Sequence, residues 1–180
     1  MLEVRKLSVT YPGQQVLTDI NLSVGTGQRL AILGPNGSGK STLLKSLSGL
    51  VEYRGEIKLS NRSLRDFKRI ELAEKVALLS QNTSMYFSYS VYETLMMGLY
   101  TQLRKSFMSV ARAKDKARVL QVMEALDLEN IRDQELSKLS GGQLQRVFFA
   151  RTLLQNPEII LQSFGYPLSA RNVAVYRGIL

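Results

Sequence analysis

The chain has 180 residues, of which 44% are hydrophobic and 22% charged, a composition typical of a folded globular domain. It contains no cysteine and no histidine, which excludes disulfides, thiolate and imidazole metal ligands, and a histidine base. No apolar run approaches the ~18 residues that would span a bilayer, and the N-terminus lacks the apolar core of a signal peptide. We therefore expect an intracellular protein.

The net charge of +9 is compatible with an anionic partner. The densest basic region, residues 104–118, carries six cations against the single acid Asp115. Aromatic residues do not alternate with these charges as they would in a platform for single-stranded nucleic acid. A solvated helix face is therefore favoured over a contact surface, and no nucleic-acid partner is expected.

The first predicted elements are strands. Residues 2–10 and 15–24 are expected to form two successive strands, because the even positions Val16, Ile20, Leu22 and Val24 are apolar and Tyr11-Pro12-Gly13 supplies a turn between them. Residues 30–33 form a short continuous apolar run typical of a strand buried on both faces. A glycine-rich loop follows this run, and residues 40–50 then read as a helix that ends at Gly49.

The remaining elements divide the chain. Strands are expected at 55–59 and 76–79, and helical signals then continue to about residue 138, including a capping box from Ser90 to Glu93. Helix 109–126 is expected to bury Ala113, Ala117, Leu120 and Met123. Another helix at 140–155 and a strand at 158–161 return to the core. We thus expect a core of residues 1–81 and 139–161, an inserted helical subdomain of 82–138, and a tail of 162–180.

The loop after the third strand has the composition of a phosphate-binding loop. Glycines let backbone amides approach a polyphosphate, and the N-terminus of the next helix adds partial positive charge. The lysine would contact the β- and γ-phosphates, and the serine that follows it would ligate Mg²⁺. The nucleotide-binding residues predicted here are Gly34, Pro35, Asn36, Gly37, Ser38, Gly39, Lys40, Ser41 and Thr42.

A second motif lies about 100 residues downstream. It reads Leu139-Ser140-Gly141-Gly142-Gln143 and opens a helix, which makes it another anion site. Together with the phosphate loop, this motif resembles the signature of ABC transporter ATPases. The resemblance covers residues 2–161 and implies that this segment faces the ATP held by another subunit.

Three further positions agree with the resemblance. Tyr11 matches the aromatic residue that stacks on adenine. Gln81 matches a glutamine that contacts Mg²⁺ and the attacking water, so Gln81 and Lys40 are the candidate catalytic residues, and Ser41 and Gln81 the candidate Mg²⁺ ligands. Arg151 matches a basic position of the signature helix.

The resemblance implies an α/β fold. We expect a P-loop NTPase core with a RecA-like mixed sheet, helices and N-terminal antiparallel strands, an inserted α-helical subdomain, and a missing C-terminal part of the core. ATP and Mg²⁺ are the implied cofactors. The implied partners are a second copy or a paired ABC ATPase subunit, membrane permease subunits and, indirectly, an extracytoplasmic substrate-binding protein. The implied location is cytoplasmic, at the inner face of the cell membrane.

Residues 76–99 most resemble importers of iron complexes or cobalamin. ATP binding and hydrolysis would then drive substrate uptake across the membrane.

The resemblance fails after Leu161. The family continues with the Asp and Glu of its Walker B motif and a later switch histidine, whereas this chain has no acidic residue after Glu158 and no histidine. The Asp holds Mg²⁺, and the Glu polarises the attacking water. Two explanations stay open: a truncated or frameshifted reading frame, or divergence into a non-hydrolysing, ATP-binding or regulatory module. A non-transport ABC protein that acts on nucleic acid is a third alternative, supported only by the basic region.

Overall fold

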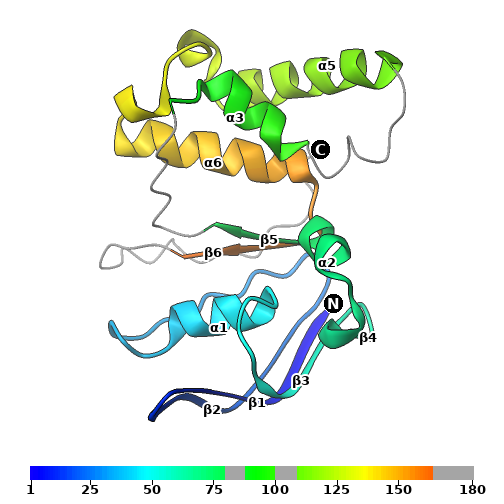
Figure 1. Cartoon of the computed structure of the whole chain (residues 1–180), viewed down its shortest axis with the longest axis vertical. Helices are drawn as coiled ribbons and strands as arrows, with labels where there is room; N and C mark the ends of the chain where they lie inside the picture. The colour runs from blue at the N-terminus through cyan, green and yellow to red at the C-terminus, as the bar shows by residue number, and fades with distance from the viewer. Residues whose placement is uncertain (80–87, 100–108, 164–180) are drawn as a thin grey trace. The chain divides into compact units, whose positions relative to one another are not determined.

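The computed structural model describes residues 1–79, 88–99 and 109–163. The chain forms two compact units (Figure 1). Unit 1 comprises residues 1–81 and 158–180, and unit 2 comprises residues 82–157. Gln81, most of the tail and part of the basic region lie outside the described residues.

Unit 1 opens with an antiparallel sheet of order β2-β1-β3-β4. The expected strands form, and Leu2 of β1 lies opposite both Val24 of β2 and Leu59 of β3. Leu2 and Val4, and then Leu7 and Val9, are buried at alternate positions of β1, which is the period of a strand with one face on a core, and a register shift separates the two pairs. The strands are β1 Leu2–Tyr11, β2 Gln14–Val24, β3 Arg54–Leu59 and β4 Arg62–Ser63.

A separate parallel pair completes the strands described in unit 1. It consists of β5 Val76–Leu79 and β6 Ile159–Gln162, which pair from Val76 opposite Ile159 to Leu79 opposite Gln162. Residues 159–161 are all buried, as expected for a parallel strand. The helices of unit 1 are α1 Lys40–Leu47, the 3₁₀ turn η1 Leu64–Asp66 and α2 Arg69–Lys75.

One expected strand is not formed. Residues 30–33 are not part of a ladder, Leu33 is 63% exposed, and Leu30 and Ile32 are only partly buried against the core of unit 1. The expectation of a strand buried on both faces is wrong in the described part of the chain. A strand inside a sheet needs a neighbouring strand to pair with and a packed layer on each face, and no described strand pairs with this segment.

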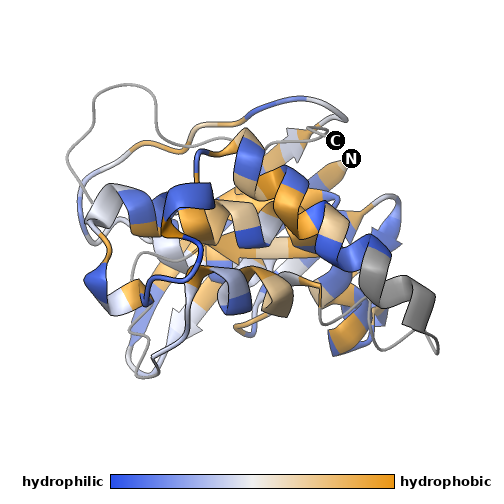
Figure 2. Ribbon diagram, turned by 90° about the horizontal axis from the view of Figure 1, so that it is seen from above, coloured by the Kyte–Doolittle hydropathy of each residue, from blue (hydrophilic) through white to orange (hydrophobic). Residues whose placement is uncertain are grey.

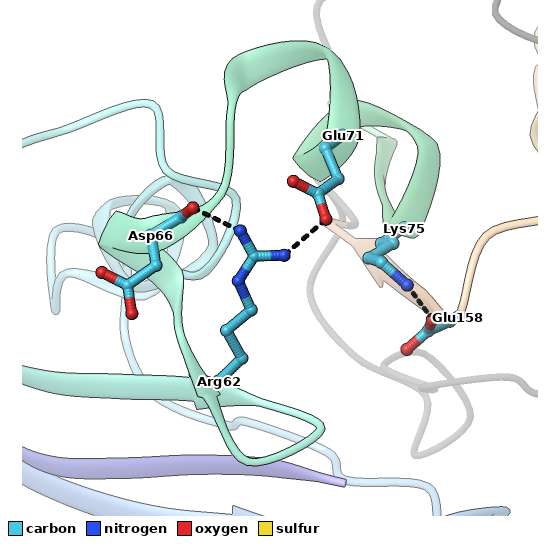
Figure 3. Close-up of polar contacts among 5 residues, drawn as sticks. All are labelled: Arg62, Asp66, Glu71, Lys75 and Glu158. Carbon is cyan, nitrogen blue, oxygen red and sulfur yellow. Dashed lines mark hydrogen bonds and ion pairs between the residues drawn. The ribbon is translucent and has the colours of Figure 1, made fainter.

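Polar contacts fasten η1 and α2 to the strands (Figure 3). Arg62 of β4 donates to the Glu71 carboxylate at 2.6 Å and to the Asp66 carbonyl oxygen, and its guanidinium lies 4.2 Å from the centroid of the Phe67 ring. At the other end of α2, Lys75 forms an ion pair with Glu158, which directly precedes β6. This pair therefore joins the amino ends of β5 and β6.

Unit 2 is helical within the residues described. Its core contains buried side chains from α3 and α5 together with Val147, Ala150 and Leu154 of α6. The predicted capping box is present, because Glu93 N donates to Ser90 Oγ at 3.2 Å and Ser90 N donates to the Glu93 carboxylate at 2.8 Å. The elements are α3 Val91–Gly98, α5 Ser109–Ala125, η2 Glu129–Ile131, η3 Leu136–Lys138 and α6 Gly141–Gln155.

Two expectations differ from the structure in unit 2. Helix α6 was expected to return to the core of the other unit, but its apolar stripe packs on α3 and α5, so the compact helical unit extends to Pro157 rather than residue 138. On α5 the buried residues are Val119, Val122 and Met123, whereas Leu120 is 47% exposed. The predicted face of the helix was defined by its two alanines, whereas the buried valines lie on a different face of α5.

Hydropathy colouring shows hydrophobic and hydrophilic residues mixed along the helices (Figure 2). Within the residues that the structure describes, none of the helices combines the length and the apolar character that crossing a bilayer requires.

Candidate nucleotide site

The phosphate loop joins the extended segment 30–33 to helix α1 in unit 1. Gly39 is the N-cap of α1 and has a φ of 87°, in the left-handed region that favours glycine. A Cβ atom at this position would lie 2.8 Å from Leu17 Cδ2 and 3.1 Å from the Val16 carbonyl oxygen. Glycine is therefore required twice here, once for the backbone angle and once for the close approach to β2.

The first turn of α1 is chemically open. No side chain caps it, and it contains no acidic residue. The unsatisfied amides of a helix N-terminus attract an anion unless a side-chain oxygen occupies them. The structure thus places the predicted loop before a helix end whose first amides remain available.

Lys40 lies at the centre of this loop. Its ammonium donates to the carbonyl oxygens of Gly34 at 2.7 Å and Pro35 at 2.6 Å, and to Ser38 Oγ at 3.4 Å. The Lys40 ammonium is thus hydrogen-bonded to three residues of the loop that precedes it. A phosphate bound there would exchange at least one neutral carbonyl partner of the ammonium for a charged oxygen, which is the stronger acceptor.

The other predicted nucleotide contacts of unit 1 are accessible. Asn36, Gly37 and Ser41 are exposed, and Thr42 is half-buried. Tyr11 ends β1 and is 38% exposed, so the ring is accessible for stacking on a base. Gln81 lies outside the described residues, and its two predicted roles stay predictions.

The carboxyl ends of β5 and β6 meet at one edge of the parallel pair. Ser163 N donates to the Leu79 carbonyl oxygen at 3.0 Å, so Ser163 directly follows the last paired position of β6. The nearest acidic residue along this strand, Glu158, stands at the opposite end, where it binds Lys75 (Figure 3). Its carboxylate also accepts from Ser60 Oγ at 3.2 Å. With ~3.3 Å per strand residue, Glu158 cannot replace a carboxylate at Ser163.

The donor set therefore fits a protein-held Mg²⁺ poorly. Mg²⁺ is usually held by one or two carboxylates together with the substrate phosphates. Here Ser41 offers a neutral hydroxyl at the start of α1, and the described residues contain no group of three or more acidic, histidine or cysteine side chains that could hold a metal.

The second predicted anion site begins α6 in unit 2. Ser140 is the N-cap, and its Oγ accepts from Gln143 N at 3.3 Å while Ser140 N donates to Gln143 Oε1 at 2.9 Å. A Cβ atom added at Gly141 or Gly142 would meet no atom within 4 Å. Leu139 is the anchor of this motif, since it packs against the core of unit 2.

The two glycines are thus not explained by packing within the chain. Glycine in a helix is disfavoured by about 1 kcal/mol relative to alanine. A surface that tolerates this cost twice, with open space above both Cα atoms, is suited to close approach by another molecule.

Sequence reasoning missed two contacts. The backing of Gly39 by Val16 and Leu17 has no local signal, because the strand and the loop are far apart in sequence. Arg151 was expected only as a basic position, yet it is half-buried in α6, where burial lowers the pKa of its guanidinium. Its backbone carbonyl lies against Gly98 of α3.

Comparisons with known proteins agree with this geometry. A family model described as "ABC transporter" matches residues 17–162. A protein of Helicobacter pylori named probable iron chelatin transport ATP-binding protein is 37% identical over 98% of this chain and 69% of its own length. The hemin import ATP-binding protein HmuV of Shewanella denitrificans is 34% identical over 100% of this chain and 70% of its own.

The Helicobacter alignment must extend into residues 162–180, which make up more than a tenth of the chain, whereas the family model ends at Gln162.

Solved structures share the fold. The ATP-binding cassette MJ0796, determined as a dimer in a post-hydrolysis state with ADP and Pi, has a TM-score of 0.76 and 29% identity over 90% of this chain and 73% of its own. The chain spans between 64% and 73% of the solved chains it matches. The expected α/β P-loop fold with N-terminal antiparallel strands is confirmed.

Proposed function

The chain belongs to the ABC transporter family as an ATP-binding domain, and from this premise we propose that it is the ATP-binding subunit of an importer for iron complexes. The observation that carries the proposal is the open first turn of α1, which begins with Lys40, whose ammonium reaches back to the carbonyl oxygens of the loop before it. The family shows the class of ligand, and this geometry supplies the amides and the ammonium that would bind its phosphates.

In the proposed complex each residue has a separate task. The loop amides and Lys40 bind the phosphates, Ser41 and Thr42 add hydroxyl donors, and Tyr11 stacks on the adenine. Gln81 is proposed to align a water, and it would link the site to a membrane permease. The chain would then work in the cytoplasm, at the inner membrane face, where the permease receives substrate from an extracytoplasmic binding protein.

Dimerisation is proposed from the second site. Gly141 and Gly142 leave open space at the start of α6, which allows a nucleotide held by another subunit to approach the helix amides. The dimeric state of the similar cassette supports this arrangement. The partner would be a second copy or a paired ABC ATPase subunit.

A second candidate function is an ATP-binding module that does not hydrolyse its own nucleotide. Ser163 at the carboxyl end of β6 favours it, because a hydroxyl neither holds a metal strongly nor takes a proton from water. Loss of a general base typically slows a reaction ~10²–10⁴-fold. Steady-state phosphate release near background, with intact ATP binding, would support this candidate over the active ATPase.

The first test is ATP affinity measured by isothermal titration calorimetry. Lys40→Ala removes a charge-assisted contact of about 1.5–3 kcal/mol, so affinity should fall by at least ~10-fold. Lys45→Ala is the matched control, because Lys45 is an exposed lysine in the last turn of the same helix. Equal affinities for the two variants would refute the phosphate-loop assignment.

Import is tested in cells. A strain lacking the chromosomal copy is complemented with wild type, Lys40→Ala or Lys45→Ala, and uptake of a radiolabelled ferric chelate is measured. The proposal expects uptake from wild type and Lys45→Ala alone. Uptake of labelled cobalamin instead of the ferric chelate would assign the other importer class.

A further inference from the structure

We propose that this chain binds its nucleotide as the metal-free polyphosphate anion, with little contribution from Mg²⁺. The proposal rests on nucleotide binding at the phosphate loop and specifies the ligand of that site. Its starting point is the poor fit between the donor set and a protein-held Mg²⁺.

Every carboxylate of the chain can be placed. The chain has 15 acidic residues, and all of them lie within the residues that the structure describes. None is in the first turn of α1 or α6, the two helix ends predicted to face nucleotide. No group of three or more potential metal ligands occurs anywhere among the described residues.

The described residues at the carboxyl edge of the parallel pair, Leu79, Gln162 and Ser163, carry no charge. Buried residues of β6 pack in one hydrophobic core with Leu43, Leu44 and Leu47 of α1, the helix that follows the loop. The carboxyl end of β6 presents Ser163, whose amide is already fixed to Leu79. A P-loop protein holds Mg²⁺ through the loop Ser/Thr together with an acidic residue, and the acidic half of that pair is absent at this edge.

The one carboxylate attached to β6 is committed elsewhere. Glu158 binds Lys75 through one oxygen (Figure 3) and accepts from Ser60 Oγ at 3.2 Å through the other. Both contacts lie at the amino end of the strand. Glu158 therefore stabilises the junction of β5 and β6 and does not serve the metal.

Positive charge at the loop favours the free anion. The Lys40 ammonium donates to two carbonyl oxygens and one hydroxyl oxygen, none of which carries a formal charge. Its positive charge is therefore available to a phosphate. Mg²⁺ removes two negative charges from the nucleotide and competes with the ammonium for the same oxygens. With no protein carboxylate to attract the metal, its presence adds little to the affinity.

The test compares nucleotide affinity with and without the metal. The full chain is titrated with ATP by calorimetry, once in excess Mg²⁺ and once in excess EDTA at equal ionic strength. The two dissociation constants should agree within about threefold. A constant ten or more times weaker in EDTA would overturn the proposal and leave nucleotide binding intact, while absent binding in both buffers would refute the phosphate-loop assignment itself.

A gain-of-function variant tests the role of Ser163. Ser163→Asp should make binding at least ~10-fold tighter in Mg²⁺ than in EDTA, since partners around a metal typically change its affinity 10–100-fold. Ser163→Asn has the same size without the charge and should behave like wild type. Equal Mg²⁺ dependence in the two variants would remove Ser163 as the missing ligand position, and if Ser163→Asp does not fold, the wild-type comparison still decides the proposal.

Discussion

Gly98 and Gly142 are helical glycines that should respond in opposite ways to alanine. At Gly98 a Cβ atom would lie 2.6 Å from the Arg151 carbonyl oxygen and 3.2 Å from Leu154 Cβ, both on α6. At Gly142 it would meet no atom within 4 Å. The comparison separates a glycine required by packing from one that packing does not explain.

The sign of the stability change at each position follows from two opposing free energies, the gain in helix propensity and the cost of overpacking. Alanine gains up to about 1 kcal/mol of helix propensity over glycine, and less in a first turn. At Gly98 the new methyl group meets backbone rather than a flexible side-chain end, so α3 and α6 must move apart, and overpacking of this kind costs about 1–3 kcal/mol. Gly98→Ala should therefore destabilise unit 2 by about 1–2 kcal/mol, whereas Gly142→Ala should leave its stability unchanged or slightly higher.

Thermal unfolding followed by circular dichroism measures both effects. For a chain of this size 1 kcal/mol shifts Tm by about 2–4 °C, so Gly98→Ala should lower the Tm that reports on unit 2 and Gly142→Ala should not. ATP-dependent dimerisation, measured by size-exclusion chromatography with light scattering, should be lost in Gly142→Ala. A stable Gly142→Ala protein that dimerises like wild type would refute the reasoning about the open helix end.

Two further predictions concern ionisable groups. Glu158→Gln removes the ion pair with Lys75. Because both side chains are about one-third exposed, the free energy of unfolding should fall by at most about 1 kcal/mol. Urea titrations in low and high NaCl should show a smaller difference between variant and wild type at high salt, which screens the pair. The pKa of Glu93 is lowered below its usual 4.5 by hydrogen bonds from the backbone and side chain of its capping serine. The stabilisation that the Glu93 carboxylate gives to the start of α3 is present above pH 4.5 and is lost as the pH falls through the lowered pKa. Protection of the amides at the start of α3 from hydrogen exchange should therefore fall over this pH range. Glu93→Gln should show no such fall, because its neutral amide caps the helix without titrating.

Features that depend on residues close to one another in the sequence could be predicted from the sequence. The glycine-rich loop before α1, the turn after Tyr11 and the capping box at Ser90 depend on residues within a few positions of one another. All of them stand in the structure where the sequence placed them.

Features that depend on distant partners were not predictable. The run 30–33 has the composition of a buried strand, but burial on both faces requires neighbours that the run cannot specify. The tight contact of Gly98 with α6 joins residues more than 50 positions apart, and nothing in the glycine's own neighbourhood signals it. Likewise, the membership of α6 in the helical unit depends on which core its apolar stripe meets.

The N-termini of α1 and α6 both present free backbone amides that attract an anion, but they differ in how many of these amides are free. Helix α1 has Gly39 as its N-cap and no side-chain cap, so under the proposed function its first amides and Lys40 would together bind several phosphate oxygens. Helix α6 begins at Ser140, whose hydroxyl already accepts from Gln143 N. The uncapped amides in that turn belong to Gly141 and Gly142, and within α6 neither Lys nor Arg occurs before Arg146. Lys138, which precedes the motif, forms an ion pair with Glu135 at 3.7 Å.

The α6 end has fewer free donors than the α1 end, and its neighbouring cation, Lys138, is already paired with Glu135, so we expect it to be too weak to hold a polyphosphate by itself. It suits a single terminal phosphate already held by another subunit. Under the proposed function, the asymmetry between the two ends sets the order of events: nucleotide binds first at α1, and the partner's α6 closes on it afterwards. ATP affinity of the monomer should accordingly be unchanged in Gly142→Ala, and a parallel loss of monomer affinity and dimerisation would contradict this order.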